Sequence, residues 1–205
     1  MNSRRAGKPR QTRAARKPAG KRGEPSPRKP LDPRKTRAPP EPPPGAAAAA
    51  PLLLRSPAAT RALGRRLGAL LQPGDFIALS GDLGAGKTLL ARGAAEGAGV
   101  PDGEQASSPT FALVHVYRGG RVALQHLDLY RLSGPADLFA LGFDDLLAEP
   151  AATLCEWPER AGVALPADRL ELALSYLGPR TRALQVAAHG PRAVALRLAL
   201  LARRR

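Results

Sequence analysis

Cysteine is almost absent from the 205-residue sequence, which contains only Cys155. A single cysteine excludes a disulfide within the chain and leaves too few thiols for a structural zinc site. Long apolar runs are also missing, because the longest near the start, residues 46–54, is too short to cross a bilayer. We therefore expect a cytoplasmic protein with no membrane association.

Large apolar residues are missing from the first fifty positions, apart from Met1 and Leu31. The same segment holds fourteen Lys or Arg against three acids, a net charge of +11, and eleven of the 22 prolines. Such a segment cannot bury enough apolar surface to offset the entropy lost on ordering. We predict a disordered basic tail over 1–50, a folded domain over 51–190 and a C-terminal extension over 191–205 that can form a helix.

Apolar periodicity predicts alternating helices and strands in the remaining residues. Helices are expected at 57–71, 87–98, 135–141, 144–148 and 193–202. Strands are expected at 52–54, 75–80, 112–117, 122–128, 152–156, 169–177 and 181–188, the last two as an antiparallel hairpin. This order predicts a small α/β domain in which helices cover a central sheet.

A glycine-rich loop follows the apolar strand expected at 75–80 and precedes a helix, the context of a phosphate-binding loop. Its glycines allow backbone N–H groups to point at phosphate oxygens, beside the positive end of the helix. A lysine in such a loop reaches the β- and γ-phosphates, and the following threonine binds Mg²⁺. The predicted nucleotide contacts are Gly81, Asp82, Leu83, Gly84, Ala85, Gly86, Lys87 and Thr88.

Lysine is otherwise missing from the folded part. Lys87 is the only lysine between residues 51 and 205, where arginine occurs seventeen times. A narrow phosphate cradle requires a compact ammonium rather than a planar guanidinium. This contrast supports a phosphate-binding role for Lys87.

Two acids end strands that follow the loop in sequence, and such acids hold hydrated magnesium in nucleotide-hydrolysing proteins. Asp128 ends the strand expected at 122–128, and Glu156 ends the one at 152–156. We choose Asp128 as the metal acid, while Glu156 either orients the attacking water or supports the metal shell. The alternative is that each acid only caps a strand end.

A guanine-reading Asn-Lys-x-Asp segment is also absent, since the only asparagine is Asn2 and the folded part has no second lysine. Adenine is therefore the expected base, and ATP with Mg²⁺ the expected ligand pair.

Four segments in this order resemble the TsaE family of bacterial tRNA threonylcarbamoyladenosine biosynthesis. They are Gly-Asp-Leu-Gly-Ala-Gly-Lys-Thr at 81–88, Ser-Pro-Thr-Phe at 108–111, His-Leu-Asp-Leu-Tyr-Arg-Leu at 126–132 and Glu-Trp-Pro-Glu-Arg at 156–160. The resemblance extends from about residue 52 to 190 and implies a three-layer P-loop NTPase-like domain with a central mixed sheet. It also implies an accessory ATPase that binds a TsaD–TsaB pair and enables further rounds of threonylcarbamoyl transfer to tRNA.

The same resemblance implies roles for individual residues. Thr88 and Asp128 would be associated with magnesium, and Glu156 would be an acid on the γ-phosphate side that also contributes to the metal site. Trp157 would lie near the nucleotide, and the loop that contains Thr110 would sense the γ-phosphate.

Other interpretations stay open at this point. A small P-loop kinase is one alternative, although no arginine-bearing lid segment is evident between the four segments. A nucleotide-gated tRNA-binding module that hardly hydrolyses ATP is another. His126 shares a strand face with Asp128 and either contacts nucleotide or partner or is simply packed. Arg131 either contacts phosphate or forms a surface ion pair.

The basic tail provides the first testable prediction. Its positive charge can attract tRNA through counterion release, but it lacks aromatic residues on which bases could stack. A tail that binds tRNA predicts that removing residues 1–50 weakens tRNA binding and flattens its dependence on salt concentration, whereas a solvated tail predicts no change. Filter-binding titrations of both chains across salt concentrations measure this effect, and equal binding would instead indicate a solvated tail without a nucleic-acid role.

Overall fold

The computed structural model describes residues 50–101, 103 and 107–202. The tail predicted to be disordered, residues 1–50, lies outside the described residues except for Ala50. None of the helices in the described part is long and apolar enough to cross a membrane.

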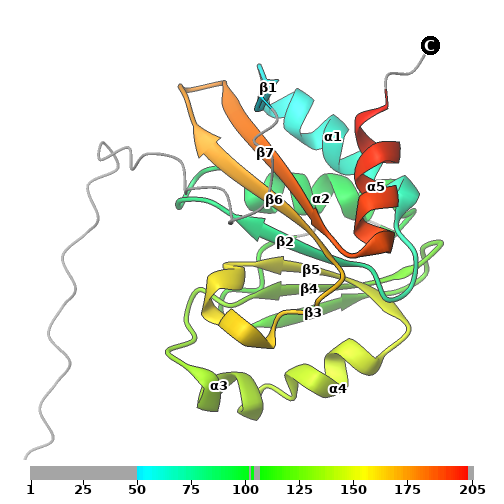
Figure 1. The fold of residues 1–205 in the computed structure, drawn as a ribbon, viewed down its shortest axis with the longest axis vertical. Coiled ribbons are helices and arrows are strands. Elements are labelled where there is room, and N and C mark those ends of the chain that lie inside the picture. Colours follow the sequence, from blue (N-terminus) through cyan, green and yellow to red (C-terminus); the bar gives the residue numbers. More distant parts are fainter. Residues whose placement is uncertain (1–49, 102, 104–106, 203–205) are drawn as a thin grey trace, which may run out of the picture. The chain divides into compact units, whose positions relative to one another are not determined.

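The chain forms strands and helices in close agreement with the predicted order (Figure 1). The strands are β1 (Leu52–Leu54), β2 (Phe76–Ser80), β3 (Val114–Tyr117), β4 (Ala123–Asp128), β5 (Ala151–Glu156), β6 (Arg169–Tyr176) and β7 (Arg182–His189). The helices are α1 (Pro57–Leu70), α2 (Lys87–Gly97), α3 (Pro135–Ala140), α4 (Phe143–Ala148) and α5 (Pro191–Leu201). Two 3-10 turns, η2 (Pro158–Arg160) and η3 (Gly162–Ala164), were not predicted.

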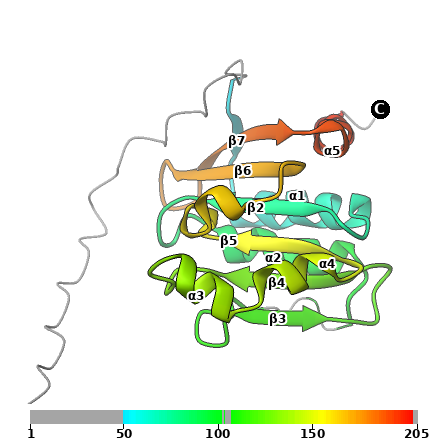
Figure 2. The same ribbon diagram turned by 60° about the horizontal axis from the view of Figure 1, so that its bottom comes forward.

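One seven-stranded sheet has the order β1-β7-β6-β2-β5-β4-β3. Strand β2 is parallel to β5 and β6, and β4 is parallel to β5, whereas β1, β3 and β7 pair antiparallel with their neighbours. The predicted α/β fold with a central mixed sheet is therefore confirmed. Because β2, β4 and β5 are parallel, their carboxyl ends meet at one edge of the sheet (Figure 2).

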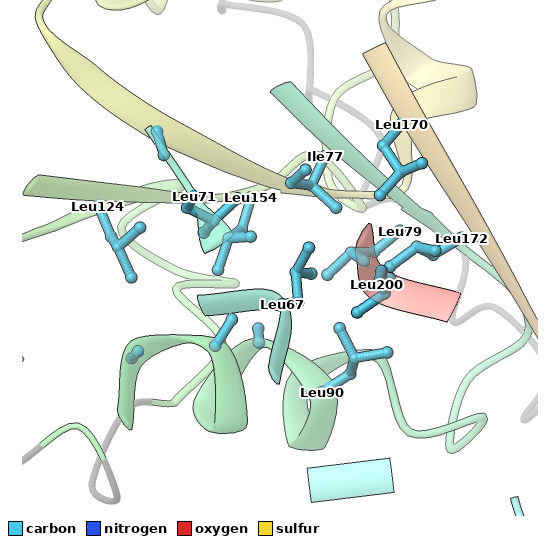
Figure 3. Close-up of a cluster of buried hydrophobic side chains, with 14 of the residues drawn as sticks. Leu67, Leu71, Ile77, Leu79, Leu90, Leu124, Leu154, Leu170, Leu172 and Leu200 are labelled. Atoms are coloured by element: carbon cyan, nitrogen blue, oxygen red, sulfur yellow. The ribbon is translucent and has the colours of Figure 1, made fainter. Parts of the chain in front are cut away.

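Helices cover both faces of the sheet, so the molecule has three layers (Figures 1 and 2). Ile77 and Leu79 of β2 belong to the core shared with α1, α2 and α5, part of which Figure 3 shows. Phe76 and Ala78 alternate with them and belong to the second core, beneath α3 and α4. Burial on both faces explains why β2 is a continuous apolar run rather than an alternating one.

Helix α1 begins as its sequence predicts. The Ser56 side chain accepts a hydrogen bond from the backbone N–H of Ala59 at 3.1 Å, and Pro57 occupies the first turn. Inside the helix, Leu67 is completely buried in the core between α1 and the sheet (Figure 3).

Residues 191–201 of the predicted C-terminal extension form α5. Asp168 accepts hydrogen bonds from the backbone N–H groups of Arg192 and Ala193, at 3.0 and 2.8 Å, and so caps the helix. The Arg192 guanidinium donates to the buried carboxylate of Asp75 at 2.6 and 2.7 Å. Leu196 and Leu200 complete the core on this face of the sheet. Helix α5 is therefore packed into the same domain as the phosphate loop.

Strand β3 begins two residues later than predicted. The prediction placed residues 112–117 in the strand, but Leu113 has a left-handed φ of 64°. Its backbone N–H donates to the carbonyl oxygen of Pro109 at 2.6 Å, which closes a turn before the strand. A branched residue rarely adopts this conformation, so nothing in the apolar pattern signalled it.

Helices α1 and α2 approach each other through glycines. A Cβ atom placed on Gly64 of α1 would lie 2.3 Å from the Leu90 carbonyl oxygen. One placed on Gly68 would lie 1.9 Å from the Ala94 carbonyl oxygen. Placed on Gly93 or Gly97 of α2, it would collide with backbone oxygens of α1 at 2.3 and 1.9 Å. The backbones of the two helices are therefore in direct contact, and α1 supports the helix that carries Lys87.

We predict that Gly68→Ala destabilises the protein, because the added methyl group must push the two helices apart. Overpacking of this kind costs about 1–3 kcal/mol, equivalent to a melting temperature about 2–12 °C lower for a chain of this size. Thermal unfolding followed by circular dichroism measures the shift. Gly178→Ala is the control, because a Cβ there meets no atom within 4 Å. Equal melting temperatures for the two variants would contradict the close helix contact.

Candidate nucleotide-binding site

The predicted phosphate loop leaves the end of β2 and enters α2 at Lys87. Gly81, Gly84 and Gly86 have φ values of 130°, 79° and 105°, a backbone region that favours glycine. Space matters as well, since a Cβ atom at Gly81 would lie 2.2 Å from the Leu174 carbonyl oxygen. The spacing of glycines in the sequence therefore corresponds to real backbone requirements of the loop.

Lys87 lies inside the loop and is only 4% exposed. Its Nζ donates to the carbonyl oxygens of Gly81 at 2.7 Å and Asp82 at 3.1 Å, and lies 3.9 Å from the centre of the Trp157 ring. Burial lowers the pKa of the ammonium, although the negative charges of nearby acids oppose this shift; these are Glu156, Glu159, Asp128 and Asp82. The site therefore holds a poorly hydrated positive charge that a phosphate could pair with.

The two predicted acids lie side by side. Asp128 and Glu156 are register partners at the carboxyl ends of the parallel strands β4 and β5. Both are buried, and the Thr88 hydroxyl donates to Glu156 Oε1 at 2.9 Å. The structure thus brings together the three residues that were predicted to lie around magnesium.

Asp128 is surrounded by donors. Its Oδ2 accepts a hydrogen bond from the Thr110 hydroxyl at 2.6 Å and another from the Ser108 hydroxyl, and its Oδ1 accepts one from the Tyr130 backbone N–H at 3.0 Å. The loop predicted to sense the γ-phosphate is therefore in contact with the predicted metal acid. Sequence spacing alone did not indicate this contact.

His126 belongs to the site rather than to a remote part of the core. Its Nε2 lies 3.0 Å from Glu156 Oε1, and both side chains are buried. The alternatives left open for His126 were a contact with nucleotide or partner and simple packing, whereas the structure places it against the second acid. The two-residue spacing from Asp128 was the available signal, because it put both side chains on one strand face.

Trp157 follows Glu156 with a left-handed φ of 60°. Strained backbone of this kind in a residue other than glycine is concentrated at functional sites. The Trp157 ring contacts both the Lys87 ammonium and the Tyr130 ring, whose centroid is 4.9 Å away. The alternatives left open for Arg131 were a contact with phosphate and a surface ion pair. Its guanidinium instead lies over the Phe111 ring, 5.0 Å from the ring centre.

Sequence reasoning missed two neighbours of the site. The negative charge of Glu159 opposes the lowering of the Lys87 pKa by burial. Tyr130 donates its backbone N–H to Asp128 and packs its ring against Trp157. Both residues belong to segments that had been singled out, but their roles depend on the 3-10 turn η2 and the turn after β4. Neither turn has an apolar period that could have revealed them.

Oxygen donors dominate the part of the site available to a metal ion. In the part of the chain that the structure describes, no three His, Cys, Asp or Glu residues are grouped to hold a metal on their own. Mg²⁺ at nucleotides is usually held by one or two protein oxygens together with phosphates and waters. Thr88, Asp128 and Glu156 supply oxygen donors, so the donor set fits magnesium delivered with a nucleotide.

Comparisons with known proteins point to one family. The family model described as "Threonylcarbamoyl adenosine biosynthesis protein TsaE" matches residues 54–184. The chain is 34% identical over 137 residues to tRNA threonylcarbamoyladenosine biosynthesis protein TsaE of Bacillus subtilis, covering 67% of this chain and 84% of that protein. It is 46% identical over 115 residues to the protein of the same name from Streptomyces coelicolor, covering 55% and 76%.

A solved structure agrees with these sequence matches. The crystal structure of Bacillus subtilis YdiB superposes with a TM-score of 0.63 at 30% sequence identity. The match covers 73% of this chain and 92% of YdiB.

We predict that Trp157 reports occupation of the loop. A phosphate that pairs with Lys87 places negative charge beside the ammonium that contacts the indole, and so changes the surroundings of the Trp157 ring. Titration with Mg²⁺ and ATP should therefore change the fluorescence of this only tryptophan saturably.

Lys87→Met is the matched variant for this titration. Loss of a charge-assisted contact should weaken binding by at least about tenfold. An unchanged binding curve would show that Lys87 does not contact the phosphates.

Proposed function

The chain belongs to the TsaE family of tRNA threonylcarbamoyladenosine biosynthesis, and from this membership we propose that it is a Mg²⁺-dependent ATPase. Its hydrolysis of ATP would support turnover of a TsaD–TsaB pair that transfers threonylcarbamoyl to tRNA. The observation that carries the proposal is the arrangement of Lys87, Asp128 and Glu156 around the N-terminal end of α2.

Binding depends on the loop and the first turn of α2. Lys87 pairs with the β- and γ-phosphates, while backbone N–H groups of the loop and the helix end hold the remaining charge. Thr88 and Asp128 would hold Mg²⁺, which would supply positive charge to offset that of the phosphates. The base is adenine, because the sequence offers no guanine-reading segment.

Glu156 positions the attacking water. Thr88 and His126 both contact its Oε1, whereas no described residue forms a hydrogen bond with Oε2. The Oε2 atom is therefore available to accept a hydrogen bond from water facing the γ-phosphate. Attack of this water forms a new P–O bond as the bond to the leaving ADP oxygen breaks, and the proton passes toward the carboxylate.

Exposed apolar side chains near the site support a protein partner. Phe111 is 90% exposed and Phe139 of α3 is 88% exposed. Phe111 also lines an open surface depression together with Leu113, Arg131 and Leu141. Apolar residues that gather in one exposed patch are typical of interaction surfaces. A TsaD–TsaB pair docked here would contact the loop that carries Ser108 and Thr110, and so would respond to the bound nucleotide.

We predict that Glu156→Gln lowers kcat for ATP hydrolysis by about 10²–10³-fold, because the amide cannot accept the proton from water. The affinity for ATP should change little, since Lys87 and the loop are intact. Phosphate release and ATP binding are measured with the purified chain, alone and with TsaD- and TsaB-type partners. Glu149→Gln, an exposed acid after α4, is the charge-matched control.

Each outcome of this experiment has a distinct meaning. Stimulation of hydrolysis by the partners, lost in Glu156→Gln, supports the proposed function. Unchanged turnover in Glu156→Gln would remove the role given to this residue. Transfer of the γ-phosphate to a small acceptor would favour a kinase, and tight ATP binding without any turnover would favour a nucleotide-gated module.

A further inference from the structure

Arg182 connects the β6–β7 hairpin to the phosphate loop. Its Nε donates to the carbonyl oxygen of Ala85 at 2.9 Å, and its Nη2 donates to that of Gly84 at 3.2 Å. Its Nη1 donates to the carbonyl oxygens of Gly178 at 2.7 Å and Thr181 at 3.0 Å, within the hairpin turn. One guanidinium therefore links two backbone segments that are far apart in the sequence.

The direction of a peptide group gives this contact its significance. In a planar trans peptide the C=O and N–H bonds point in opposite directions. Arg182 holds the Ala85 carbonyl, so the N–H of the same peptide unit, which belongs to Gly86, points away from the guanidinium. Phosphate loops bind their ligand through backbone N–H groups that point inward. By holding the Ala85 carbonyl, Arg182 therefore also fixes the direction of the Gly86 N–H.

Other contacts hold the first half of the loop, since Lys87 donates to the carbonyls of Gly81 and Asp82 and the Ala85 N–H donates to that of Asp82 at 3.1 Å. The Arg182 contacts act on the second half. Gly84 and Gly86 on either side of Ala85 have left-handed φ values of 79° and 105°. Glycine has more backbone freedom than any other residue, and this freedom must be lost when the loop orders.

The anchor itself is held firmly. Arg182 begins β7, where its backbone pairs with Leu54 of β1 on one side and Tyr176 of β6 on the other. Its guanidinium also lies over the Tyr176 ring, 4.6 Å from the ring centre. The orientation of the loop is therefore tied to three adjacent strands of the sheet.

We propose that Arg182 is a positioning residue for the phosphates of the bound nucleotide. It acts by holding the Ala85 carbonyl, with a second contact to that of Gly84, so that the Gly86 N–H is oriented before the ligand arrives. The inference rests on the proposed ATP-binding function and deepens it. The planar guanidinium of arginine is needed for this role, because its N–H donors have fixed directions and reach both loop carbonyls. A lysine ammonium is a single point charge and cannot replace them.

Three variants of the full chain test the proposal, with Mg²⁺ and ATP binding measured by isothermal titration calorimetry. Arg182→Gln should raise the Kd by about tenfold or more, because the loop carbonyls lose their donors. Arg182→Lys should bind within about threefold of Arg182→Gln, because charge alone does not orient the peptide. Arg180→Gln removes the same charge from the exposed turn nearby and should bind like the unmodified chain.

Steady-state hydrolysis and thermal unfolding separate positioning from folding. Positioning predicts a rise in KM for ATP that exceeds any fall in kcat, with folded protein at the assay temperature. If Arg182→Gln does not fold, Arg182→Lys carries the test, since it keeps the charge and most of the side-chain volume. Normal ATP affinity in folded Arg182→Gln or in Arg182→Lys would overturn the proposal.

These outcomes are distinguishable from failure of the proposed function. An unmodified chain that neither binds nor hydrolyses ATP would overturn the ATPase proposal itself. An unmodified chain that does both, with Arg182 variants that match it, would overturn only the positioning role.

Discussion

The buried ammonium of Lys87 is the interaction on which the rest of the site depends. A positive charge removed from water needs compensation, and the structure supplies it with two carbonyl oxygens, the Trp157 ring and nearby carboxylates. Those carboxylates would repel an incoming triphosphate if nothing else contacted them. Their oxygens accept hydrogen bonds from Thr88, Ser108 and Thr110, which offset part of this negative charge.

The sheet determines where these charges lie. Parallel pairing of β4 and β5 makes Asp128 and Glu156 direct neighbours, and parallel pairing of β2 and β5 places the start of the phosphate loop beside them. The period of two along β4 then puts His126 on the face of Asp128, within reach of Glu156. A single sheet register thus arranges residues that are separated by up to 75 positions in the chain.

The sequence predicted the elements well, because each has a strong apolar period and a recognisable end, such as Ser56-Pro57 before α1. It also predicted where the glycine loop and the two acids lie, because such residues occur at fixed spacings relative to the strands. It could not predict features that arise from long-range backbone geometry. The left-handed residues Leu113 and Trp157 have no sequence signal, and the contacts of Arg182 join segments whose proximity depends on the strand order.

The glycine contact between α1 and α2 has a mechanical consequence. The glycines bring the two backbones into contact, and Arg61 and Arg65 of α1 pair with Glu96 of α2, so we expect the two helices to move as one unit. The half of the site that holds Lys87 and Thr88 is therefore stiff and continuous with α1. The opposite half depends on exchangeable hydroxyl contacts between Ser108, Thr110 and Asp128. We therefore expect the side that carries exposed Phe111 to be the more mobile part of the site.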